Sequence, residues 1–138
     1  MTLQDLEKRY RGIQTLLKNI DTDGCLFLCL CSIIEEITDK PADLIMIIKT
    51  SIAKGWLSLD YEVKDALALL NCFTGKRFKR KIMPYLPTHI HDNEFSVEKW
   101  FNPDTKYEHF KRRFTDTLLN SVTVAKGYIK EYYIYYYE

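Results

Sequence analysis

Residues 21–33 read DTDGCLFLCLCSI and contain the longest uninterrupted apolar run of the chain, residues 25–31. The polar residues at positions 21–23 offer N-terminal caps, and they predict a helix from about residue 24 to about residue 37. This helix is apolar nearly all round, which is typical of a helix buried at the centre of a domain. Its apolar run is far shorter than the roughly 20 residues that span a bilayer. We therefore expect the fold to be built around this helix.

The segments on either side of this helix divide the chain into two halves. Helical spacing of apolar residues predicts helices at 3–17 and 42–54, with Pro41 opening the latter, and a further helix from Ser58 or Asp60 to just before Gly75. Segments rich in aromatic and β-branched residues then predict strands at 77–83, 95–101, 107–114 and 128–137. We predict a single α+β domain over 1–138. Its N-terminal helices, within about 1–75, pack on a C-terminal, mainly antiparallel sheet within about 76–138.

The composition is that of an ordinary globular domain. Hydrophobic residues make up 46% and charged residues 28% of the 138 positions, and the net charge is +1. This balance argues against a nucleic-acid partner, and the short apolar runs argue against a membrane partner. The N-terminal residues 1–12 lack the apolar segment of a signal peptide, so the expected location is the cytoplasm.

The cysteines predict reduced thiols rather than disulfides or a metal site. Cys25, Cys29 and Cys31 lie in one predicted helix, where a crosslink would constrain little, and the fourth, Cys72, lies in another. Their spacing is not that of a zinc site, and the only close histidine pair, at positions 89 and 91, is far away in the sequence. We expect no metal and no cofactor.

Cys25 is the candidate nucleophile because it falls at the start of the central helix. The partial positive charge and the N–H groups of a helix N-terminus favour a thiolate. A cysteine nucleophile also needs a base, and His109, in TKYEHFKRRF at the start of a predicted strand, is the candidate. The alternatives are that Cys25 is a small buried apolar residue like Cys29 and Cys31, and that His109 is a half-buried histidine packed on the sheet.

The sequence predicts a cysteine at a helix start, helices in the first half and a histidine on a strand of a C-terminal sheet. This order along the chain resembles that of papain-like cysteine peptidases. The sequence resembles their compact bacterial branch, the bacteriocin-processing double-glycine-leader peptidases. That branch has a glutamine at the oxyanion hole six residues before the nucleophile, where this chain has Asn19 in KNIDTDGC, and a His-Phe pair matched by His109-Phe110. GWLSLDYEVKD is similar to the Gly-Trp-and-acidic stretch that small members of this branch have ahead of their second helix pair. SVTVAKGYIKEYYIY is similar to the segment that these members have before their last strand. The GC-x-F start and the HF strand also resemble an uncharacterised family encoded on spirochaete plasmids and prophages.

The resemblance implies a third site residue, an aspartate that orients the histidine. The matching position is Asp116, in FTDTLLNS. Only six residues, FKRRFT, separate it from His109, and an extended run of that length would carry the two roughly 23 Å apart. A sharp turn is needed to join them, and Asp92 or Asp104 could serve instead. This shortened segment is also what a disabled relative would show.

The leading hypothesis is a thiol hydrolase, a peptidase or amidase, in which Cys25 attacks, His109 transfers the proton, Asp116 orients the ring and Asn19 faces the oxyanion. Its substrate would be a peptide or protein. The alternative is a non-catalytic module that binds a protein or peptide through the tyrosine-rich strand EYYIYYYE. A third, weaker hypothesis is a nucleic-acid accessory that uses the basic runs KRFKRK and KRR.

Overall fold

The computed structural model describes residues 24–112 and 126–138. Within these ranges, helices precede strands, as the sequence predicts. The elements are α3 (Cys25–Thr38), α4 (Leu44–Ala53), α5 (Ala66–Thr74), β1 (Phe78–Met83), β2 (Glu94–Phe101), β3 (Glu108–Lys111) and β4 (Tyr128–Tyr137). In the described part of the chain, no helix has both the length and the apolar character needed to cross a membrane.

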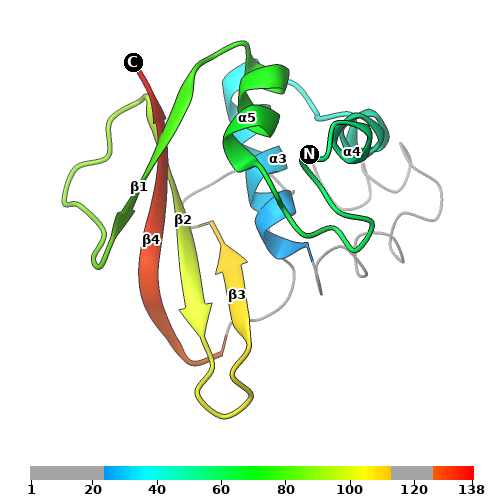
Figure 1. The fold of residues 1–138 in the computed structure, drawn as a ribbon. Helices are drawn as coiled ribbons and strands as arrows, with labels where there is room; N and C mark the ends of the chain where they lie inside the picture. Colours follow the sequence, from blue (N-terminus) through cyan, green and yellow to red (C-terminus); the bar gives the residue numbers. More distant parts are fainter. Residues whose placement is uncertain (1–23, 113–125) are drawn as a thin grey trace.

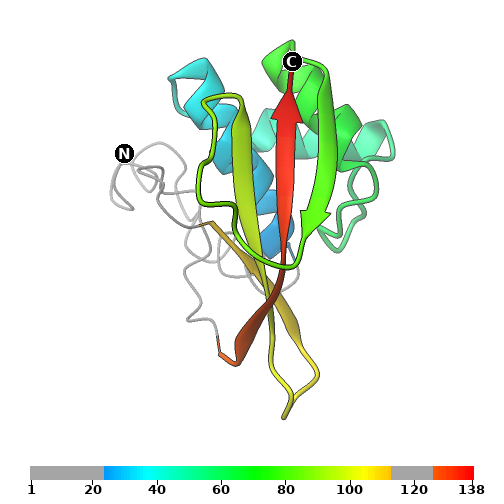
Figure 2. The same ribbon diagram turned by 90° about the vertical axis from the view of Figure 1, so that its left-hand side faces the viewer.

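The four strands form one antiparallel sheet in the order β1-β4-β2-β3. The C-terminal strand β4 therefore lies inside the sheet between β1 and β2 (Figure 2). The short strand β3 pairs with β2 over Glu98–Phe101, and no other described strand lies on its far side. The sheet and the preceding helices confirm the predicted α+β class.

The helices stack on one face of the sheet, with α3 and α5 next to the strands and α4 farther out (Figure 1). The core between these layers contains most of α3, including Phe27, Leu30 and Ile33, which are fully buried. Cys29 and Cys31 are part of the same core. The apolar circumference of α3 thus predicts its position correctly, because a helix packed against the sheet and two helices has no solvent-facing side over most of its length.

The tyrosine-rich strand β4 alternates between the two faces of the sheet. Tyr135 is fully buried in the core beneath the helices, and Tyr133 and Tyr137 pack against the same core. Tyr132 and Tyr136 lie on the other face and are partly exposed. Half of this aromatic run therefore belongs to the core.

Two helix starts differ from the sequence-based expectation. Helix α4 begins at Leu44, where the Asp43 carboxylate accepts a hydrogen bond from Met46 N, and not directly after Pro41. Helix α5 begins at Ala66 with Asp65 as its cap, later than Ser58 or Asp60.

The residues between α4 and α5 form an ordered loop instead of the first turns of a helix. The Ser58 hydroxyl accepts hydrogen bonds from the backbone N–H groups of Asp60 and Glu62. Leu57 and Val63 form an isolated antiparallel bridge. Serine at the start of such a turn competes with helical hydrogen bonding, and this competition explains the delayed helix.

Candidate functional site

Cys25 is the first residue of α3, directly after the N-cap residue Gly24. Gly24 makes no side-chain capping bond, and the first turn of α3 contains no acidic residue. The positive end of the helix dipole is therefore not offset by an acid within that turn. Cys25 is 6% exposed. The structure therefore places Cys25 at the start of a helix, as the sequence predicts.

The Cys25 sulfur lies against the edge strand β3. The backbone N–H of Phe110 donates a hydrogen bond to Cys25 Sγ, with an N···S distance of 3.4 Å, although the two residues are 85 positions apart. This N–H therefore points away from β2, toward α3. A donor aimed at sulfur stabilises a thiolate more than a thiol, because the negative charge strengthens the bond.

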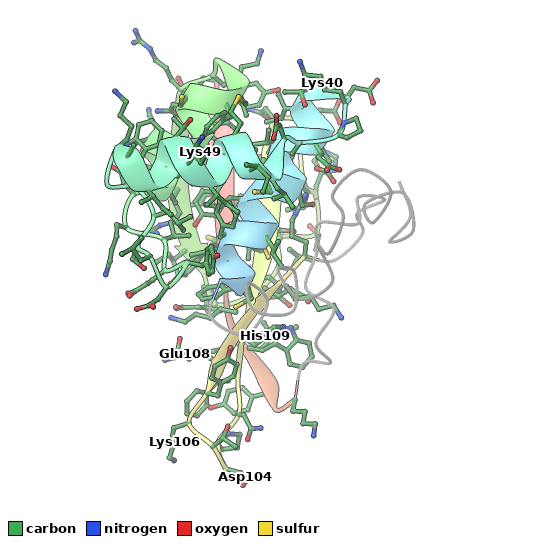
Figure 3. All side chains as sticks on the ribbon, turned by 90° about the vertical axis from the view of Figure 1, so that its right-hand side faces the viewer. Lys40, Lys49, Asp104, Lys106, Glu108 and His109 are labelled. Atoms are coloured by element: carbon green, nitrogen blue, oxygen red, sulfur yellow. The ribbon has the colours of Figure 1, made fainter. Side chains whose placement is uncertain are left out.

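His109 directly precedes Phe110, so the structure brings the backbone of the predicted base next to the predicted nucleophile. His109 lies opposite Trp100 in the β2–β3 ladder and is 4% exposed. Its ring stacks on that of Tyr107, with 6.3 Å between ring centroids. The side chains of Glu108 and His109 leave β3 on opposite sides (Figure 3). The sulfur at the strand edge thus lies beside the residue that carries the imidazole.

The other cysteines have different surroundings. Cys29 and Cys31 are fully buried in the core, whereas Cys72 is exposed, and all four thiols are reduced. Burial, with smaller contributions from Glu35 and Cys29, raises the pKa of the Cys31 thiol well above its ordinary value. Cys31 is therefore an inert packing thiol, and Cys72 is a natural reference for an ordinary solvent-exposed thiol.

Cys25 lines a cavity of about 320 Å³ between the start of α3, the loop before α5 and the β3 edge. The lining is mostly apolar and aromatic, with two carboxylates. It consists of Cys25, Leu26, Tyr61, Glu62, Val63, Tyr107, Glu108 and Phe110. A cavity of this size is at the lower end of the range for ligand pockets and suits a single side chain or a short peptide segment.

Tyr61 contributes an unusual backbone conformation to this cavity. Its φ angle is +64°, in the left-handed region that bulky residues rarely adopt. The loop holds it there through a hydrogen bond from Tyr61 N to Ser58 O and through the Ser58 hydroxyl. Such residues concentrate at binding and active sites. No periodicity in the sequence could have identified Tyr61.

The Lys99–Glu108 ion pair fixes the charge on the helix-facing side of β3. Lys99 Nζ lies 2.8 Å from a Glu108 carboxylate oxygen. Burial opposes the charge of Lys99, but hydrogen bonds from its ammonium to Glu108 and Tyr133 raise its pKa overall. The same hydrogen bond lowers the pKa of Glu108. Glu108 is therefore a fixed carboxylate and not a proton carrier at neutral pH.

Arg112 connects the end of β3 to the middle of α3. The guanidinium lies 3.1 Å from a Glu36 carboxylate oxygen and donates to the Ser32 hydroxyl at 3.1 Å and to Ser96 O at 3.3 Å. It is 6% exposed and also lies over the Phe95 ring. This network holds the end of β3 against α3. It lies two residues along the chain from Phe110, whose backbone contacts Cys25.

The structure does not bring the two alternative aspartates, Asp92 and Asp104, into this cluster. Asn19 and Asp116 lie outside the residues that the structure describes. Asp104 lies at the tip of the β2–β3 hairpin, well below His109 (Figure 3), and Asp92 lines a different cavity, of about 370 Å³. In 24–112 and 126–138 there is no group of three or more histidine, cysteine or acidic side chains that could hold a metal ion.

The basic run 76–81 is engaged within its own sheet. Lys81 forms a 2.8 Å ion pair with Glu94, and Arg80 lies over the Tyr133 ring. Lys76 lies over the Tyr137 ring. These contacts favour a role in the sheet over one in nucleic-acid binding.

Comparisons with models of known protein families, with curated proteins and with solved structures found no match to this chain.

Proposed function

We propose that the protein is a thiol hydrolase of the papain-like kind, acting on a peptide or another acyl substrate, with Cys25 as nucleophile and His109 as base. One observation carries the proposal. The sulfur of a cysteine at a helix N-terminus accepts a backbone hydrogen bond from the residue after His109, at the wall of a cavity. A nucleophile, a strand-borne imidazole and a binding space are the components of covalent acyl transfer.

In the proposed reaction, the Cys25 thiol gives its proton to His109, and the thiolate attacks the acyl carbon. A C–S bond forms and the C–N bond to the leaving group breaks, while the imidazolium returns its proton to the leaving amine. His109 then takes a proton from water, the resulting hydroxide attacks the thioester, and Cys25 is released. The cavity beside Cys25 would hold the substrate side chain next to the scissile bond, because its walls are aromatic and aliphatic.

The test compares two thiols in one molecule. Folded protein is treated with a substoichiometric amount of iodoacetamide at pH 7, and peptide mapping by mass spectrometry measures the modification of each cysteine. An ordinary thiol is only about 3% ionised at pH 7, so an activated Cys25 should react on the order of tenfold faster than Cys72 even though Cys72 is exposed. His109→Gln should remove this advantage and leave the Cys72 rate unchanged.

Acyl transfer is tested with p-nitrophenyl acetate. The wild-type protein should release a burst of nitrophenol and gain one acetyl group on Cys25, which is then lost by hydrolysis, and Cys25→Ser should show neither event. If Cys72 labels faster than Cys25 in the wild-type protein, the hydrolase proposal is wrong. The non-catalytic module on the same scaffold is then the better description.

A further inference from the structure

A buried polar cluster lies on the face of β2 and β3 that points away from the helices. Glu98, in the middle of β2, is only 4% exposed, although glutamate is rarely buried unless it is paired. Its cross-strand neighbours are Lys111 on β3 and Tyr132 on β4. His109 is buried on the same face. A carboxylate and an imidazole that are both withdrawn from water on adjacent strands indicate a site that uses them together.

The strand register sets how these two side chains meet. His109 lies directly opposite Trp100, and Glu98 lies directly opposite Lys111. Glu98 and His109 are therefore diagonal neighbours on one face, a relation with Cβ atoms about 7–8 Å apart or slightly less. Glutamate and histidine side chains are long enough to span that gap.

Trp100 holds the carboxylate in this place. Its indole N–H donates a hydrogen bond to Glu98 Oε1 at 3.2 Å. Trp100 is also the direct cross-strand partner of His109, so the residue that restrains Glu98 stands opposite the residue that carries the imidazole. Next to this point β4 contains an extra residue, Lys130, opposite the step from Lys99 to Trp100. Such bulges often occur next to active sites.

Two other carboxylates in the part of the chain that the structure describes are differently placed. Glu108 leaves β3 on the opposite side and is paired with Lys99 (Figure 3). Asp104 lies at the hairpin tip (Figure 3). Across the sheet the order is therefore Cys25 at the edge of β3, His109 on β3 and Glu98 on β2. In a catalytic triad the imidazole lies between the nucleophile and the orienting carboxylate, and this order of residues is compatible with that arrangement.

We propose that Glu98 is the positioning residue that orients the His109 imidazole and stabilises its protonated form, which is the role that the family resemblance gives to Asp116. This inference rests on the proposed function, because the value of a held imidazole is its exchange of a proton with Cys25. Among the described residues, the groups on this face next to His109 also include Lys111, whose positive charge opposes imidazolium formation, and the rings of Tyr107 and Trp100.

The test is an NMR titration of the His109 ring, assigned by comparison with His109→Gln, in wild-type protein and in Glu98→Gln. Loss of the carboxylate should lower the His109 titration midpoint by about one pH unit and slow Cys25 alkylation at pH 7 several-fold. Glu98→Asp should restore part of both effects. Glu94→Gln, which removes a carboxylate from the same face of the same strand four residues away, should leave both unchanged.

An unchanged His109 midpoint in folded Glu98→Gln overturns the role of Glu98, even where wild-type Cys25 reacts fast. Should Glu98→Gln not fold, Glu98→Asp carries the same test, with a smaller downward shift expected and no shift as the refuting result. Slow labelling of wild-type Cys25 refutes the proposed function separately, so the two failures are distinguishable.

Discussion

Arg112 is predicted to determine whether β3 stays against α3. We consider Arg112→Met, which keeps the aliphatic stem of the side chain but removes the guanidinium, with its ion pair to Glu36 and its hydrogen bonds to Ser32 and Ser96. Breaking a fully buried pair costs about 3–5 kcal/mol. Because the Glu36 side chain is 27% exposed and water can solvate part of it, we expect a loss of about 2–3 kcal/mol.

The assay is urea unfolding followed by circular dichroism, with Lys81→Met as the matched control. Lys81 forms an ion pair with Glu94 at 2.8 Å, but its side chain is 42% exposed, so its loss should cost less than about 1 kcal/mol. A double-mutant cycle with Glu36→Gln should give a coupling energy of about 1 kcal/mol for the pair with Arg112. If Arg112→Met costs no more than the control, Arg112 does not connect β3 to α3 energetically.

Three further predictions concern other parts of the fold. Gly127→Ala would place a Cβ 2.0 Å from Phe101 O at a φ of +100° and should cost about 3 kcal/mol or more in urea unfolding, whereas Gly75→Ala, at φ +72° with nothing within 4 Å, should cost about 1 kcal/mol. Equal costs would contradict this. The hydrogen bond from Lys81 lowers the pKa of Glu94, so its contribution to stability is complete above about pH 4.3 and is lost as the pH falls through the lowered value. Glu94→Gln should therefore lose less stability than wild type between pH 7 and pH 3, and parallel curves would refute this. Cys31 should resist iodoacetamide until urea unfolds the protein, because burial raises the pKa of its thiol, and its labelling in the native state would be the contrary result.

The sequence predicts the secondary structure well where one physical signal dominates. The apolar run of α3 and the aromatic run of β4 are strong local signals, and both elements lie close to their predicted ranges. The loop before α5 was predicted wrongly because Val63 lies at helical spacing from Ala66, Leu67 and Leu70, whereas in the structure it forms a bridge with Leu57. Local hydrogen bonding by Ser58 decides between the two, and hydropathy does not record it.

The candidate site could be predicted only in part. Cys25 was identifiable because a helix start has local signals, and His109 because few histidines exist. Glu98 was missed because EFSVEKWF reads as an ordinary half-exposed strand, and alternation along one strand does not show which strand lies beside it. Its proximity to His109 follows from the placement of β3 next to β2, a long-range property of the sheet.

The pH dependence of Cys25 alkylation in Cys72→Ser protein tests the central claim most directly. If Cys25 and His109 share a proton, the rate of modification should stay nearly constant from about pH 9 down to about pH 7, and in His109→Gln it should fall about tenfold per pH unit over that range below pH 8.5. A wild-type rate that already falls tenfold per unit below about pH 8.5, like that of a simple thiol, would contradict the account.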